Sequence, residues 1–379
     1  MKIKRHELIR NIISTILAFA IVGIYALIAL NLAIFNPVAQ VMRDYSINDF
    51  YYQMLGMSEA KDTSHVVSIV DISNHKERRD VAQVLHNISL QEPKVIGVDV
   101  LFKGTKPDKE GDSLMAVEAA NTANAVFAYE LLYEAFDKPV CHEVSRSYFA
   151  DSISTIKEGF VNMPRHLQGG IKRTFPLARK VNEDLRPSMI KVLADAYAGR
   201  ETLPLEDREL GINFSPIAFR VIPSDSISYY PEYLADRIVI IGDVHDDDDM
   251  HITPQGKLAG SKLLGYGIET VLKHIEIKNS PWWLTAIVSF ILVLISKILF
   301  EKYLKYVENK KNPYLKMLLK TVLVIGLIKL LWMALLMWIA FLLFYHFSFS
   351  INLAWALSAI AFTGSADSFY NTIKNSLTN

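Results

Sequence analysis

Residues 66–102 read VVSIVDISNHKERRDVAQVLHNISLQEPKVIGVDVLF, an apolar run, an amphipathic segment and a second apolar run. The runs at 66–73 and 94–102 are short and rich in β-branched residues, which is typical of strands buried on both faces. Between them, apolar residues recur at helical spacing from Val81 to Ile88. This strand–helix–strand order predicts parallel pairing in a sheet that helices cover on both faces.

The same alternation continues along the middle of the chain. Further strands are expected at 125–132, 212–222 and 233–244, and further helices at 112–124, 187–199 and 260–280. A Gly169-Gly170 pair between GFVNM and IKRTFPLA predicts a β-hairpin. The expected fold class is α/β, a mixed and largely parallel sheet flanked by helices.

Both ends of the chain are apolar enough to cross a membrane. No charged residue lies between Ile12 and Phe35, and a bilayer core needs about 20 apolar residues in a helix. Three more spans are expected, which gives a four-helix transmembrane region; they lie at 282–300, 321–344 and 347–366. Lys329, inside the third span, is expected to snorkel or to make a polar contact within the bundle rather than to line a transport pathway.

The orientation follows from the Lys and Arg residues that flank the spans. They crowd before the first span and in the connector 301–320, and such flanks stay in the cytoplasm. The predicted division of the chain has four parts. Residues 1–35 are the cytoplasmic N-terminus with the first span, and residues 36–280 are an extracytoplasmic domain. Residues 281–366 are the last three spans with their basic loop, and residues 367–379 are a short cytoplasmic tail. We expect the main domain to lie outside the cytoplasm.

Charge and cysteine content exclude several classes of function. The region 36–280 holds 27 of the 40 Lys and Arg residues but 36 of the 40 Asp and Glu residues. Nucleic-acid binding would need a basic face, so it is not expected. Cys141 is the only cysteine, so the chain forms no internal disulfide.

Three predicted strands each end in an acid, Asp71, Asp99 and Asp243. Ligands of open parallel sheets bind beyond the carboxyl ends of the strands, so these side chains could converge on one site. Converging carboxylates repel one another unless a divalent ion or a basic side chain neutralises them, and the basic candidates are Arg78, Arg79 and Lys103. The alternative is that each acid only caps the following turn or helix.

The stretch GDVHDDDDMHITPQG at 242–256 is the second candidate. His245, Asp249 and His251 are weak candidates for metal ligands, but their spacing matches no known metal motif. A solvated acidic loop is the alternative. The sequence contains no nucleophile elbow and no phosphate-binding loop, so we expect neither an enzyme nor a cofactor.

In combination, the stretches SINDFYYQM, VVSIVDIS, KVIGVDVLF and LADRIVIIGDVHDDDDMHITPQG, followed by three spans, resemble the CHASE2 family. This resemblance implies an extracytoplasmic sensory domain of a bacterial membrane receptor, and hence an inner-membrane protein whose main domain is periplasmic. The family's recurrent positions correspond here to Asp49, Asp71, Asp99, Asp249, His251, Thr253 and Pro254. Two positions depart from its pattern, at Ile72-Ser73-Asn74-His75 and at Gln168-Gly169-Gly170.

The resulting hypothesis is a stand-alone sensor or accessory signalling subunit. It would bind a small-molecule or envelope ligand through Asp71, Asp99, Asp243, Asp249, His251, Thr253 and Arg79. Only 13 residues follow Ala366, so the output would come from a separate cytoplasmic effector. Membrane lipid and a second copy of the chain are the other expected partners. Two alternatives stay open, a structural envelope scaffold and an extracytoplasmic metal-dependent hydrolase that uses Asp71, Asp99, Asp243 and His251.

Overall fold

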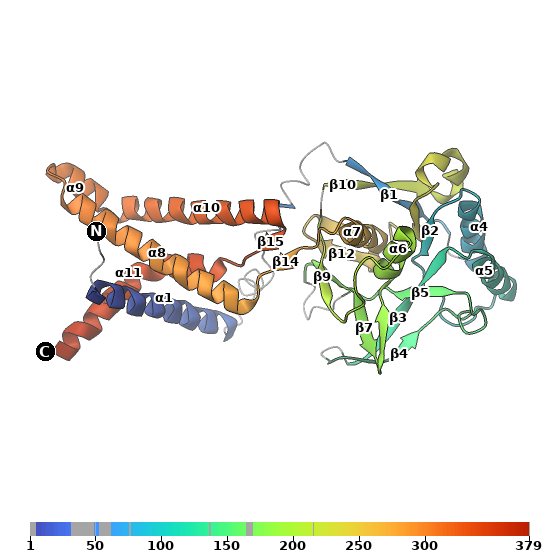
Figure 1. Ribbon diagram of the computed structural model, residues 1–379, viewed down its shortest axis with the longest axis horizontal. Coiled ribbons are helices and arrows are strands. Elements are labelled where there is room, and N and C mark those ends of the chain that lie inside the picture. The colour runs from blue at the N-terminus through green and yellow to red at the C-terminus, as the bar shows by residue number, and fades with distance from the viewer. Residues whose placement is uncertain are drawn as a thin grey trace. The chain divides into compact units, whose positions relative to one another are not determined.

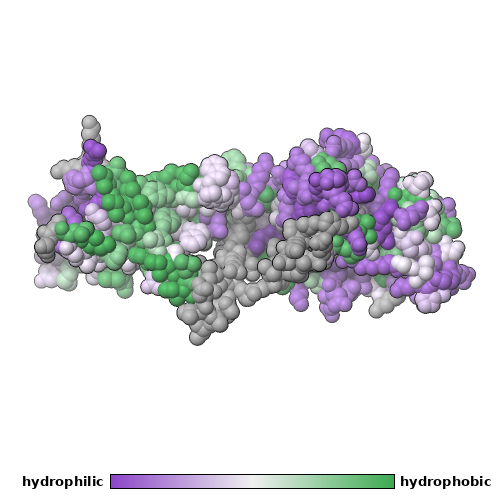
Figure 2. All heavy atoms as spheres, turned by 90° about the horizontal axis from the view of Figure 1, so that it is seen from below, coloured by the Kyte–Doolittle hydropathy of each residue, from purple (hydrophilic) through white to green (hydrophobic). Residues whose placement is uncertain are grey.

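The computed structural model describes residues 5–31, 49, 51–52, 62–75, 77–135, 138–163, 170–214 and 216–378. The chain divides into two units, which we call the helical unit (Met1–Asn48 with Lys278–Asn379) and the sheet unit (Asp49–Ile277) (Figure 1). Hydrophobic residues gather over the helical unit in Figure 2, whereas the visible face of the sheet unit is mostly hydrophilic. Each unit is described separately below.

The sheet unit contains a nine-stranded sheet in the order β10-β1-β11-β2-β3-β4-β7-β8, with β5 paired to β3. Its centre is parallel, as predicted, and consists of β1 (Asp62–Asp71), β11 (Ile238–Gly242), β2 (Val95–Val98) and β3 (Ala125–Ala135). The outer strands are β10 (Ile217–Pro223), β4 (Lys138–Ser145), β5 (Lys157–Phe160), β7 (Ala178–Val181) and β8 (Asp184–Pro187). Strand β11 lies between β1 and β2, so the two strands of the 66–102 stretch are not neighbours.

Helices cover both faces of this sheet. On one face lie α4 (Arg78–Ser89) and α5 (Lys109–Asn121), whose apolar residues form one core cluster with those of β1, β2 and β11. On the other lie α6 (Met189–Ala198) and α7 (Gly260–Leu272). Gly97 of β2 allows α6 to approach closely, because a Cβ there would meet the Leu193 side chain at 2.8 Å. The buried faces of the helices fix the layered α/β arrangement.

The predicted hairpin around Gly169-Gly170 is wrong. Strand β5 pairs parallel with β3, and β6 (Thr174–Pro176) pairs antiparallel with β9 (Glu209–Gly211) instead. Gly159 in β5 also lies directly against the backbone of Met189 on α6, where a Cβ would clash. The pairing partners of both strands are thus distant in sequence. Gly169, with the residues before it from 164 onward, lies outside the described residues.

The sheet unit also contains several short elements. Strands β12 (Met250–Thr253) and β13 (Gly256–Ala259) form a hairpin that leads into α7. The 3-10 helices in the described part of the unit are η2 (Ser224–Tyr229) and η3 (Pro231–Tyr233), between β10 and β11, and η4 (Asp247–Asp249), after β11.

The helical unit consists of α1 (Arg5–Asn31), α8 (Trp282–Glu308), α9 (Pro313–Leu319), α10 (Val322–Phe347) and α11 (Ala354–Thr378). A short pair of parallel strands, β14 (Lys278–Asn279) and β15 (Phe349–Ser350), joins the start of α8 to the segment before α11. Small and apolar side chains of α1, α8, α10 and α11 form its core cluster. The connector 301–320 is largely helical, because α8 continues to Glu308 and α9 follows.

Three helices in the described part of the chain are long and apolar enough to cross a membrane, the stretch Arg5–Ile28 of α1 and the whole of α8 and α10. The fourth expected span, 347–366, has different bounds in the structure. Ser348 adopts a left-handed conformation with φ of 50° after α10, β15 follows, and α11 begins only at Ala354. The uncharged part of α11 therefore ends at Ala366, well short of the roughly 20 residues that a bilayer core requires. A four-helix transmembrane region is not confirmed.

Candidate functional site

The three strand-end acids lie at one edge of the sheet. Asp71 at the end of β1 is in register with Gly242 of β11, and Ile241 is in register with Val98 of β2. Asp243 and Asp99 directly follow these last two strands. We call this region, with the 243–251 loop and the start of α7, the acidic edge. It occupies the position at which open parallel sheets bind ligands.

Asp71 serves mainly to shape this edge. Its Oδ1 accepts hydrogen bonds from the N–H groups of Ser73 at 3.0 Å and Val244 at 3.3 Å. Its Oδ2 accepts a further bond from the Ser73 hydroxyl at 3.0 Å. These contacts tie the loop after β1 to the loop after β11, which agrees with the capping alternative for this residue.

The loop after β11 is built from its own carboxylates. Asp243 Oδ1 accepts from the His245 N–H at 2.8 Å, and Asp246 Oδ1 accepts from the Asp248 N–H at 3.0 Å. The His245 side chain is 75% exposed, with its Nε2 at 3.6 Å from Asp71 Oδ2. Such short-range bonds fix the turn, and they leave the imidazole largely in solvent.

Asp249 connects this loop to the last helix of the sheet unit. Its Oδ2 accepts from the N–H of Gly260, the first residue of α7, at 3.2 Å. Its Oδ1 lies 3.4 Å from His251 Nε2. A Cβ on Gly260 would collide with this carboxylate, so the contact requires glycine. A carboxylate at a helix N-terminus is stabilised by the free backbone amides there.

Asp99 differs from the other acids because no described residue donates a hydrogen bond to its carboxylate. Burial, and secondarily the charge of Asp249, raises the pKa of Asp99 to about 7. The basic side chains that were expected to neutralise this edge do not do so. Arg78 pairs with Asp112, Arg79 with Asp108, and Lys103 with Glu130.

Two further predicted ligand residues have structural contacts elsewhere. Arg79 forms a bidentate pair with Asp108, the N-cap residue of α5, with its Nε at 3.0 Å from Oδ2 and its Nη2 at 2.9 Å from Oδ1. Thr253 is buried in the β12–β13 turn, where its hydroxyl donates to the Gly256 carbonyl at 2.8 Å and accepts from the Gln255 N–H at 3.2 Å. The hydrogen bonds of Arg79 and Thr253 are therefore made to other residues than the strand-end acids.

Asp49, another position implied by the family resemblance, is also paired. Its carboxylate is buried and accepts a bidentate interaction from Arg173, with an Nε–Oδ1 distance of 2.9 Å. This pair links the segment at 49–52 to the strand β6 region of the sheet unit. Its contacts indicate a structural role.

Sequence reasoning missed Ser261, which lies beside the acidic edge. Its side chain is fully buried, and its Oγ has no hydrogen-bond partner among the described residues. A Cβ on Gly242 would meet Ser261 Cβ at 2.9 Å and Asp99 Cβ at 3.6 Å, so all three residues are close. The only signal in the sequence was the Gly-Ser pair that opens the expected last helix.

The weak metal candidates do not assemble into a metal centre in the described part of the chain. No group of three His, Cys, Asp or Glu side chains there is arranged to hold an ion. His245 lies next to Asp71 and His251 next to Asp249, so the two imidazoles have different carboxylate neighbours. Rather than a ligand cage, the acidic edge offers one carboxyl group without a hydrogen-bond donor among the described residues, Asp99. The second carboxylate, Asp249, is held at the start of α7.

The helical unit contains a second set of polar side chains, which we call the polar ladder. Its rungs link α1 to α8 and α11: Glu7 to Lys305 at 2.9 Å, Arg10 and Asn11 to Glu301 at 2.5 and 3.0 Å, and Ser14 to Asp367 at 2.6 Å. Asp367 of α11 also pairs with Lys297 of α8, whose side chain is only 2% exposed. Positions 297, 301 and 305 are spaced by four, so they follow one face of α8 over about 12 Å.

Lys329 on α10 makes a polar contact inside the helical unit, as one of the two alternatives predicted. Its Nζ donates to Thr363 Oγ1 of α11 at 3.0 Å and lies 5.6 Å from the centre of the Phe300 ring. Trp332 Nε1 on the same helix donates to Ser296 Oγ on α8 at 2.7 Å. These bonds connect α10 to both α8 and α11.

Comparison with known families gives one match. The sequence model of the CHASE2 domain matches residues 16–299. The search of curated proteins and the search of solved structures found no match. The matched range contains the described sheet unit, most of α1 and the greater part of α8.

Proposed function

The chain belongs to the CHASE2 domain family, whose members are extracellular sensory domains, and from this premise we propose that it is a membrane-bound sensor. The acidic edge binds the ligand, and the helical unit passes the response through the membrane to a separate cytoplasmic effector. The observation that carries the proposal is the extent of the match, because residues 16–299 join two membrane-crossing helices to the sheet unit between them.

The chemistry of the acidic edge supports a small cationic or hydrogen-bond-donating ligand. The charge of Asp249 contributes to the raised pKa of Asp99, and none of the expected basic side chains pairs with Asp99. A bound cation, ammonium or hydroxyl group would remove this repulsion. The fully buried Ser261 hydroxyl, which has no hydrogen-bond partner in the described part of the chain, lies beside Asp99.

The polar ladder supports a route for the signal. The chain passes between the two units after α1 and before α8. These two helices are joined by the pair Glu7–Lys305 and by the contacts of Arg10 and Asn11 with Glu301. A shift by one helical turn, about 5.4 Å, would replace every rung by a different pair. Such a helix pair has discrete arrangements, and a ligand that favours one of them shifts the population.

The rest of the proposal concerns topology and partners. We place both termini and the basic connector 301–320 in the cytoplasm of a bacterial inner membrane, the sheet unit in the periplasm, and α11 with the spans as a fourth helix. The Lys and Arg distribution at both ends of the chain supports this orientation. We propose a role without catalysis, in which the effector docks on the cytoplasmic side and the chain can pair with a second copy.

Ligand binding is tested by thermal unfolding of the full-length protein in detergent against cations, polyamines, amino acids and sugars. A ligand of the acidic edge raises the Tm of the native chain and fails to raise that of Asp99→Asn or Asp249→Asn. Asp236→Asn is the matched control, because Asp236 is exposed and has a positive φ of 56°, which Asn tolerates. A Tm increase that survives both edge substitutions places the ligand elsewhere.

The orientation is tested separately with single introduced cysteines in a Cys141→Ser background, since native Cys141 is buried. An impermeant maleimide applied to intact spheroplasts labels a cysteine at Asp236 and does not label one at Lys311. Labelling of the second position without lysis contradicts the proposed topology.

A further inference from the structure

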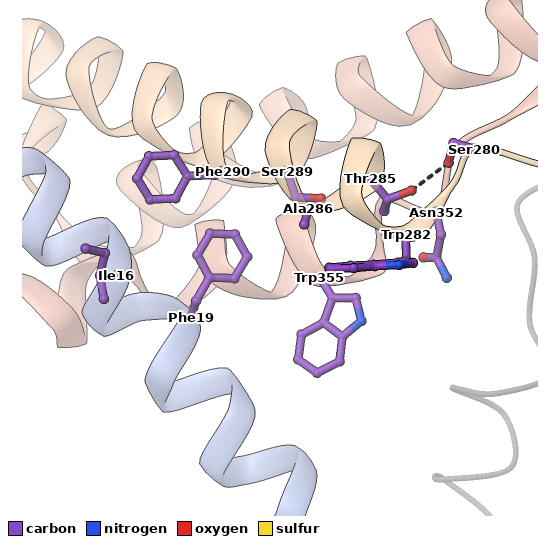
Figure 3. A pocket seen from close by; sticks show the side chains of 10 residues that line it. All are labelled: Ile16, Phe19, Ser280, Trp282, Thr285, Ala286, Ser289, Phe290, Asn352 and Trp355. Atoms are coloured by element: carbon purple, nitrogen blue, oxygen red, sulfur yellow. Dashed lines mark hydrogen bonds between the residues drawn. The ribbon is translucent and has the colours of Figure 1, made fainter.

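A cavity of about 720 Å³ lies within the helical unit, between α1, α8 and the segment around the start of α11 (Figure 3). Its walls are mainly apolar: Ile16 and Phe19 come from α1, Ala286 and Phe290 from α8, and Trp355 from α11. This volume falls in the range of about 300–1,000 Å³ that is usual for small-molecule sites. None of the polar ladder residues lines it.

The cavity has a polar end and an apolar end. Ser280, Trp282 and Asn352 lie at one end of it in Figure 3, and Ile16 and Phe290 lie at the other. The polar end is at the first turn of α8, where that helix begins after the sheet unit. Trp side chains concentrate at the boundary between hydrocarbon and headgroups, so a Trp-lined polar end marks the membrane interface.

Small side chains on α8 create the space. Thr285, Ala286 and Ser289 occupy the cavity wall, and the adjacent α8 residue Ile287 points elsewhere, being 51% exposed and absent from the lining. A larger side chain at Ala286 would therefore project into the cavity, whereas one at Ile287 would not. The two neighbouring positions give a matched pair of substitutions.

We propose that this cavity binds one acyl chain of a bilayer phospholipid, with the ester groups at the Ser280–Asn352 end. The apolar walls lie among helices that can cross a membrane, and an empty void there would lose its dispersion contacts. A lipid chain from the surrounding bilayer fills such a void, and the polar end meets the glycerol region of the same lipid. This assignment requires the helical unit to lie in a membrane, and it does not depend on any ligand of the acidic edge.

The first test measures bound lipid in the full-length protein by native mass spectrometry after reconstitution with phosphatidylethanolamine and phosphatidylglycerol. The native chain and Ile287→Phe each retain one phospholipid per chain, and Ala286→Phe retains at least about tenfold less. Equal retention by all three, or no retention by any, overturns the proposal. A bound free fatty acid or detergent in place of phospholipid overturns it as well.

The second test uses only the native sequence, so it does not depend on how Ala286→Phe folds. A phospholipid with a photoactivatable acyl chain is crosslinked to the reconstituted protein, and the labelled peptides are identified. The expected labels fall within 16–19 and 282–290, above the background on the exposed face of α10. Uniform labelling of all exposed helix faces shows that only the general lipid annulus contacts the protein, and it contradicts the assignment.

Discussion

The acidic edge of the sheet unit and the polar ladder of the helical unit hold their charged side chains in different ways. In the sheet unit, Asp71 and Asp243 are held by backbone N–H groups of nearby loops, and Asp99 has no cationic partner among the described residues. In the helical unit, each rung of the polar ladder joins side chains of different helices, and Lys297 is almost fully buried against Asp367.

The difference follows from the surroundings of each unit. At a solvent-accessible sheet edge, water and backbone amides can support a carboxylate, so its charge remains available for a ligand or a proton. Between apolar helices, an unpaired charge is costly, so it must be paired within the protein. The carboxylates of the sheet edge therefore suit a site that can bind and release a ligand or a proton. The paired charges between the helices fix the register of those helices. The predictions below test this contrast.

The largest effect is expected at the buried pair of the polar ladder. Asp367→Leu leaves Lys297 without its counter-charge and lowers the free energy of unfolding by about 3 kcal/mol. The double variant Lys297→Met with Asp367→Leu recovers most of that loss, because neither charge remains. Thermal unfolding in detergent measures both, with Lys302→Met, an exposed residue on the same helix, as the control. Equal losses in the single and double variants contradict a paired charge.

A smaller effect is expected at the loop carboxylate of the sheet unit. Asp71→Ala removes the acceptor for the N–H groups of Ser73 and Val244 and costs about 2 kcal/mol. Hydrogen exchange at the Val244 amide should speed up accordingly. The same substitution at the exposed Asp247 should leave that amide unchanged. If both variants behave alike, Asp71 does not organise the edge.

Asp99 should make the stability of the sheet unit depend on pH. Its folded pKa of about 7 lies above the ordinary value of 3.8, so the native state binds more protons between these values. Stability therefore falls as pH rises through this range and levels off above pH 7. Asp99→Asn removes the fall and is more stable than the native chain at pH 8, with the difference vanishing near pH 4. Parallel Tm profiles of the two proteins would refute this.

The smallest effect is expected at Arg79, which was predicted from the sequence to contact the ligand. Its ion pair with Asp108 is exposed to solvent, which weakens the attraction, so Arg79→Ala should change Tm only slightly. Any ligand that stabilises the native chain through Asp99 should stabilise this variant equally. If the Arg79→Ala variant loses the response to the ligand, Arg79 is part of the binding site, and the expectation is wrong.

The candidate site was predictable in part. The apolar runs ending in Asp71, Asp99 and Asp243 placed the acids at strand ends, and parallel pairing then brings them to one edge. The neutralising role expected of Arg78, Arg79 and Lys103 was wrong, because proximity in sequence does not specify which acid a long basic side chain reaches. Ser261 was missed because its position depends on the packing of α7 against β11.

The helical unit shows the same limit. Long apolar runs predicted α1, α8 and α10 as spans, since the length and hydrophobicity of a helix are local properties. The bounds of the last helix were wrong, because β15 pairs with β14, about 70 residues earlier in the chain. The partner of Lys297 was likewise out of reach, since Asp367 was assigned to a tail rather than to a helix facing α8.

The sequence by itself determined the central strands of the sheet, the long apolar helices, and which of these strands carry an acid at the end. Periodicity and hydrophobic length are encoded within short windows, so they can be read without knowing the neighbours. Only the tertiary structure decided that β11 separates β1 from β2, that Asp99 is left without a cation, and that α1, α8 and α11 enclose a cavity. These features depend on contacts between residues far apart in the chain, where strand order and side-chain volume select among many compatible pairings.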